Sequence, residues 1–118
     1  MNALESLAIT TLRRWAWERG KLSRGPIAHT VPLMPGRLSH TTRATLREAA
    51  LIRCIDFERA FAQLPEIDQA LLVSRYVEGL PDHATARILG HSPRWVSYRL
   101  GAARALLAAV LDKLDLLS

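Results

Sequence analysis

The chain has a single cysteine and no long apolar run, and each shortage excludes a class of protein. Cys54 has no second cysteine with which to form an internal disulfide or a multi-cysteine zinc site. No apolar stretch approaches the ~18 residues that a transmembrane helix needs. The first residues also lack the basic segment followed by an apolar segment that marks a secretory signal. We therefore expect a soluble, cytoplasmic protein.

Residue patterns for catalysis or metal binding are also missing. The four histidines are scattered along the chain, and none forms with a carboxylate the i, i+4 pattern of a helical zinc site. The sequence contains no glycine-rich phosphate loop, Ser/His/Asp set or recognisable pair of catalytic carboxylates. We expect no enzyme activity, cofactor or metal.

Positive charge is concentrated at the two ends of the chain. Sixteen Lys and Arg against eleven Asp and Glu give a net charge of +5. Residues 1–47 hold eight cations and two acids, a net of +6, and residues 48–91 hold four and seven, a net of −3. Residues 92–118 hold four cations and two acids, a net of +2. Basic ends around an acidic middle suit a nucleic acid or another polyanion.

The N-terminal part predicts a helix followed by a basic arm. Apolar residues recur every three or four positions over residues 2–19, with Asn2 as a possible N-cap and Gly20 as a stop. Glycines and prolines interrupt residues 21–40, which we interpret as a basic loop that orders against a partner. The expected organisation is a helix over 1–20, this loop over 21–40 and a helical domain over 41–118.

Two tryptophans lie among arginines near the end of the first helix. One interpretation is that Trp15 is part of the core and that Trp17 packs under an arginine stem. The other is a surface that contacts a nucleic acid or a protein partner. The candidate contacts for that surface are Arg13, Arg14, Trp15, Trp17, Lys21, Arg24 and Arg37.

Two further helices are expected in the middle of the chain. The first begins near Thr45, where a capping box ends on Glu48, and continues to Leu64 before Pro65, which starts the next helix at its first position. Cys54 falls on its apolar stripe, so we expect a small buried residue there rather than a nucleophile. The second helix spans 66–77, with Gly79 just beyond its end.

Residues 79–111 predict a helix-turn-helix. A short helix fits 82–89, Gly90 allows a left-handed turn, and Ser92 and Pro93 suit the N-cap and first position of a new helix. The new helix has an inward stripe formed by Val96, Leu100, Ala103, Leu107, Val110, Leu114 and Leu117.

The other side of this last helix has the chemistry of a DNA-reading surface. It carries arginine, hydroxyl groups and Gly101, and the sequence has no acid between Asp82 and Asp112. Arginine reads guanine edges in the major groove, and hydroxyls contact bases or phosphates. An ordinary solvated helix face is the alternative. The candidate DNA contacts are Arg94, Trp95, Ser97, Tyr98, Arg99 and Arg104.

About half of the chain resembles sigma-70 region 4. The resemblance is carried by three stretches of sequence, at 61–80, 86–93 and 96–104. It implies a small all-α domain whose C-terminal helix-turn-helix binds double-stranded DNA. Thr85 and His91 stand where the family usually has aliphatic residues, and Pro81 replaces its usual polar cap.

The layout of the whole chain is similar to small phage antitermination proteins of the Q type. The shared features are the N-terminal helix with Trp15 and Trp17, the basic loop, the helix with Cys54 and the C-terminal half. Phage late-gene activators of the RinA and ArpU types share that C-terminal half. These resemblances imply a phage or prophage regulator that acts in the bacterial cytoplasm with RNA polymerase, as an antiterminator or a late-gene activator.

Three functions remain open from the sequence. The first is this DNA-binding transcription regulator. The second is a small terminase subunit for DNA packaging, which would form a large ring. The third is a module that binds polymerase, with or without a sigma factor, and does not read DNA. A homo-oligomer is compatible with each of them.

Overall fold

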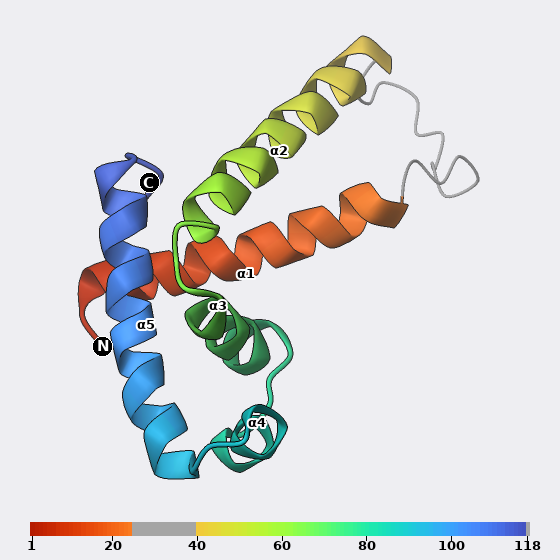
Figure 1. The fold of residues 1–118 in the computed structure, drawn as a ribbon. Coiled ribbons are helices and arrows are strands. Elements are labelled where there is room, and N and C mark those ends of the chain that lie inside the picture. The colour runs from red at the N-terminus through yellow and green to blue at the C-terminus, as the bar shows by residue number, and fades with distance from the viewer. Residues whose placement is uncertain (25–39, 118) are drawn as a thin grey trace.

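The computed structural model describes residues 1–24 and 40–117, and within these ranges every regular element is a helix (Figure 1). The expected all-α fold is confirmed for this part of the chain. A π-helical turn, η2 (Val73–Val77), directly follows the third helix. The five α-helices are α1 (Ala3–Arg24), α2 (His40–Phe61), α3 (Glu66–Leu72), α4 (Asp82–Leu89) and α5 (Pro93–Lys113).

The core lies around α5, which packs against α1, α2, α3 and α4. Figure 1 shows α5 crossing the N-terminal half of α1. α4 lies beside the N-terminal end of α5. Every α-helix supplies buried apolar side chains to one continuous cluster. The fully buried large side chains of this cluster are Leu12, Leu71, Leu72, Val96, Leu107 and Leu111.

α1 belongs to this core. Its Ala8, Ile9 and Leu12 are at most 4% exposed and pack in the same cluster as the side chains of α5. The first helix therefore packs with helices of the region 41–118, which the sequence analysis did not expect. The side-chain oxygen of Asn2 accepts a hydrogen bond from the Glu5 amide at 2.8 Å, as expected for an N-cap.

The end of α1 and the start of α2 differ from the positions that the sequence predicts. α1 continues through Gly20 to Arg24, because a single glycine weakens a helix by only about 1 kcal/mol and does not end it. α2 already begins at His40, so Thr45 lies inside the helix rather than at its cap. The sequence from 40 to 64 holds no glycine or proline that would prevent this earlier start.

The connection from α2 to α3 is a tight turn before Pro65. α2 ends at Phe61, three residues earlier than expected, and the Leu64 amide donates to the Phe61 carbonyl at 3.1 Å. Pro65 is the N-cap of α3 and not its first helical residue. The proline disfavours the helical conformation at Leu64, so the helix cannot continue into α3 without a break.

The predicted helix over 66–77 is present, but its second half is wound as a π-helix. α3 ends at Leu72, and η2 continues to Val77. Gly79 follows with a φ of +72°, the left-handed conformation expected just past a helix end.

The inward stripe of α5 is confirmed over its first four members and then shifts. Val96, Leu100 and Leu107 are at most 4% exposed, whereas Leu114 is 42% exposed and lies beyond the end of the helix. A strict 4-3 repeat has a period of 3.5 residues, while an α-helix turns every 3.6. The buried side therefore moves to Leu111, which is fully buried.

Leu100 tests this core because it is 4% exposed in the middle of the stripe. Truncation of a buried leucine to alanine costs ~2–5 kcal/mol, and Leu100→Asp adds an unpaired buried charge. We expect this variant to be unfolded at 25 °C, since a small domain is stable by only ~5–15 kcal/mol. Circular dichroism melting checks it, with Leu114→Asp as the exposed control. A wild-type melting curve for Leu100→Asp would contradict the packing.

Candidate nucleic-acid interface

The turn between α4 and α5 has the local geometry that the sequence predicts. Gly90 caps α4 in the left-handed conformation, with a φ of 73°, and the His91 amide donates to the Ala86 carbonyl at 3.0 Å. Ser92 is the N-cap of α5, and its hydroxyl accepts a hydrogen bond from the Trp95 amide at 3.1 Å. Pro93 lies in the first turn of α5. Backbone N–H groups in that turn have no acceptor within the helix, so the proline removes no hydrogen bond. These contacts fix where α5 begins.

The first two turns of α5 present an exposed polar face. Arg94, Ser97 and Tyr98 are all exposed, and Tyr98 is the most exposed large side chain that carries an aromatic ring, at 83%. Gly101 lies one turn further on the same side. Gly101 is half-buried, and a Cβ placed there would lie 3.6 Å from the Arg104 guanidinium. The sequence prediction that these residues share an outer face is confirmed.

Trp95 packs at the turn between α4 and α5 and is not part of the exposed face. It is half-buried against the core cluster, and its ring stacks on the exposed His91 ring with centroids 3.7 Å apart and planes at 13°. Its indole therefore already has a stacking partner inside the protein. The sequence analysis counted Trp95 among the DNA contacts, but a base could stack on this face of the indole only by displacing His91.

Arg99 is held by an internal carboxylate. Its Nε donates to an oxygen of Asp68 on α3 at 2.7 Å, and its Nη2 donates to the other oxygen at 3.4 Å. The Asp68 side chain is only 5% exposed, against 38% for Arg99. The hydrogen bond and the charge of Asp68 raise the pKa of the Arg99 guanidinium above its usual value. Arg99 therefore joins α3 to α5, which is a different task from the DNA contact assigned from the sequence.

Arg104 is also engaged within the fold. Its Nη1 donates to the Tyr76 hydroxyl at 3.0 Å, and its Nε lies 3.5 Å from a carboxylate oxygen of Glu5. Arg13 reaches the same Tyr76, with its guanidinium carbon 5.5 Å from the ring centroid. These contacts do not fit the assignment of Arg104 as a DNA contact, because the guanidinium connects α5 with η2 and α1.

The N-terminal candidates lie apart from the α5 face. Trp15 stacks on Phe57 with centroids 5.2 Å apart and donates its indole N–H to Glu58 at 2.8 Å, so its role is structural, as one of the two interpretations predicted. Trp17 is 63% exposed, and the Lys21 ammonium lies 4.3 Å above its ring. Arg14 is exposed near the same region.

Two candidates of the basic arm cannot be placed with the others. Arg37 lies outside the described residues, and only the backbone of Arg24 is described, at the end of α1. The assignment of these two cations to a polymerase or nucleic-acid contact therefore stays a prediction.

Sequence reasoning missed two residues of this region. Arg87 is exposed in the last turn of α4, next to the turn that leads into α5. The sequence could have indicated Arg87 as a DNA contact, because it lies seven residues before Arg94 in a stretch without acids. Asp68 is the second, and no local pattern marks a carboxylate whose partner is 31 residues away.

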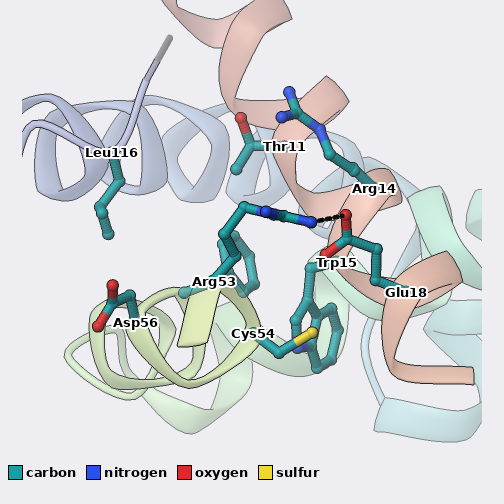
Figure 2. A pocket seen from close by; sticks show the side chains of 9 residues that line it. Thr11, Arg14, Trp15, Glu18, Arg53, Cys54, Asp56 and Leu116 are labelled. Atoms are coloured by element: carbon teal, nitrogen blue, oxygen red, sulfur yellow. Dashed lines mark hydrogen bonds and ion pairs between the residues drawn. The ribbon is translucent and has the colours of Figure 1, made fainter. Parts of the chain in front are cut away.

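A small pocket between α1 and α2 offers little chemistry. Figure 2 shows the Cys54 sulfur beside the Trp15 indole and the Arg53 guanidinium reaching Glu18, in a space of about 100 Å³. Cys54 is 1% exposed, and burial raises the pKa of its thiol, which disfavours the nucleophilic thiolate. In the part of the chain that the structure describes, no three His, Cys, Asp or Glu side chains are grouped to hold a metal ion.

Comparisons with protein families, with curated proteins and with solved structures find no match to this chain. None of the helices in the described ranges is both long enough and apolar enough to cross a membrane.

The ion pair between Asp68 and Arg99 leads to a stability prediction. Arg99→Ala leaves a buried carboxylate without its donor, which costs more than removing one member of an exposed pair. We expect its melting midpoint to fall further than that of Arg75→Ala, whose partner Asp82 is 31% exposed. Asp68→Asn added to Arg99→Ala should restore part of the loss, since a neutral amide is less costly to bury. Equal midpoints for Arg99→Ala and Arg75→Ala would contradict the structural role of the pair.

Proposed function

We propose that the chain is a sequence-specific DNA-binding transcription regulator of phage or prophage type that acts with RNA polymerase, as an antiterminator or a late-gene activator. The observation that carries the DNA-binding part is the exposed face of Arg94, Ser97 and Tyr98 on the first two turns of α5. α4, the turn and α5 form a helix-turn-helix in this proposal, and α5 is its recognition helix. The polymerase part rests on the resemblance in sequence layout.

The chemistry of this face suits a major groove. Arginine donates two hydrogen bonds to the O6 and N7 atoms of guanine, and the Ser97 and Tyr98 hydroxyls both donate and accept. Arg94 lies in the first turn of α5, where a recognition helix usually meets base edges. No acid interrupts residues 83–111, so nothing in this stretch repels phosphate.

Phosphate contacts are assigned to Arg87 rather than to Arg104. Arg87 is exposed on α4, the helix that crosses the DNA backbone in this class of reader, and no carboxylate pairs with it among the described residues. Backbone contacts of this kind position the protein but carry no sequence information.

Substitution of the reading residue should separate specific from general binding. On the duplex that the wild-type chain prefers, Arg94→Ala should cost ~1–3 kcal/mol and relax the sequence preference. Arg87→Ala should weaken binding to all duplexes by similar amounts and reduce its salt dependence. Fluorescence anisotropy measures both, with Arg59→Ala, an exposed cation of α2, as the control. Equal losses for Arg94→Ala on preferred and random duplexes would refute base reading.

The regulatory part of the proposal needs a transcription assay. We expect the chain to change RNA synthesis by polymerase only on templates that contain its preferred DNA site. An antiterminator raises read-through of a terminator placed downstream, whereas an activator raises initiation and leaves the fraction of read-through unchanged. Arg94→Ala should lose either effect in proportion to its loss of DNA binding. An effect of equal size on templates without the site would contradict the account.

A further inference from the structure

A cleft opens between α1 and α2 on the side of the molecule away from the α4–α5 turn. Figure 1 shows the C-terminal half of α1 and the N-terminal half of α2 diverging from each other here. The cleft has a volume of about 410 Å³. Its walls are formed by Trp17, Lys21 and Leu22 of α1 and by Leu46, Arg47 and Ala50 of α2.

The walls expose large apolar side chains. Trp17 is 63% exposed and Leu46 is 54% exposed, one on each helix. Exposed aromatic and leucine side chains that face each other across a cleft are typical of surfaces that bind another protein segment. Burial of these two side chains would favour a partner with an apolar face.

The free charges at the rim are positive. Lys21 lies over the Trp17 ring on the α1 wall, and Arg47 of the α2 wall donates to the Leu22 carbonyl at 3.2 Å. Neither cation pairs with a carboxylate among the described residues. The only acid that lines the cleft, Glu18, is 14% exposed and is neutralised by Arg53 at 3.0 Å. Both walls therefore offer a cation to a negatively charged partner.

We propose that this cleft binds an amphipathic protein segment, with apolar side chains on one face and carboxylates along its edges. A groove between two helices accepts the apolar face of a third helix, and Lys21 and Arg47 then meet its acids. A nucleic acid fits less well, because its phosphates would gain nothing from Leu46 and Ala50 and would approach Glu18. This cleft would be the place where the proposed polymerase contact is made. The inference that it binds a protein segment stands on the cleft itself, and only the identification of that segment with polymerase rests on the proposed function.

Synthetic peptides test the cleft without knowledge of the natural partner. The probe is a helical peptide with leucines on one face and glutamates flanking them, and its control has lysine in place of every glutamate. The three indole N–H signals of the isotope-labelled full chain report the site of binding by NMR. The glutamate peptide should shift the signal of Trp17, while Trp95, which stacks on His91 at the α4–α5 turn, should not move.

Charge reversal at the rim supplies the matched variants. Lys21→Glu with Arg47→Glu should weaken binding of the glutamate peptide by at least about tenfold, since it replaces attraction with repulsion. Arg59→Glu with Lys113→Glu changes the net charge by the same amount at exposed positions outside the cleft, and should bind like wild type. Circular dichroism melting shows whether each double variant is folded.

The outcomes distinguish this inference from the proposed function. Arg94→Ala should bind the glutamate peptide like wild type, so a failure of DNA reading leaves the test valid. The inference is overturned if the glutamate peptide leaves the Trp17 signal unmoved, if the lysine peptide binds equally well, or if both double variants lose affinity to the same extent. A shift of Trp17 caused by a random DNA duplex, and not by the glutamate peptide, would assign the cleft to nucleic acid instead.

Discussion

The inward side of α5 is the constraint on which the rest of the structure depends. Val96, Leu100, Ala103, Leu107 and Leu111 all face the core, where α5 packs against each of the other α-helices. A helix that is buried along one side has no freedom to rotate about its axis. The residues on its opposite side are therefore fixed as the outer surface of the molecule. The position of the candidate DNA-reading face therefore follows from the packing of the buried side of α5.

Polar contacts then set the position of α5 relative to its neighbours. The ion pair between Asp68 and Arg99 connects α3 with α5 one residue after Tyr98. Arg104 connects α5 with Tyr76 of η2 and with Glu5 of α1. Apolar burial is tolerant of small shifts, whereas these contacts need particular distances. Two arginines that were expected from the sequence to contact DNA hold α5 in place instead.

Features that depend on neighbours in sequence were predictable. The start of α5 at Ser92 and Pro93 and the left-handed Gly90 follow from capping and turn preferences that act within four residues. The burial of Cys54 followed from its place on an apolar stripe. The exposed face of Arg94, Ser97 and Tyr98 followed from the same periodicity.

Features that depend on distant residues were not predictable. The boundaries of α1 and α2 were wrong because Gly20 and the apparent capping box at Thr45 are weak local signals, which do not by themselves end or start a helix. The partners of Arg99 and Arg104 lie 31 and 28 residues away and leave no local pattern. The role of α1 in the core was also missed, because periodicity shows that a helix has an apolar side but not what that side packs against.

The two proposed surfaces lie on different elements, one for DNA on α5 and one for a protein segment between α1 and α2. The central claim is that α5 reads a DNA sequence. Selection of bound duplexes from a random-sequence pool by the full chain tests it most directly. The account predicts enrichment of one sequence motif, and loss of that enrichment in Arg94→Ala. Salt-sensitive binding to the pool with no enriched motif would contradict it.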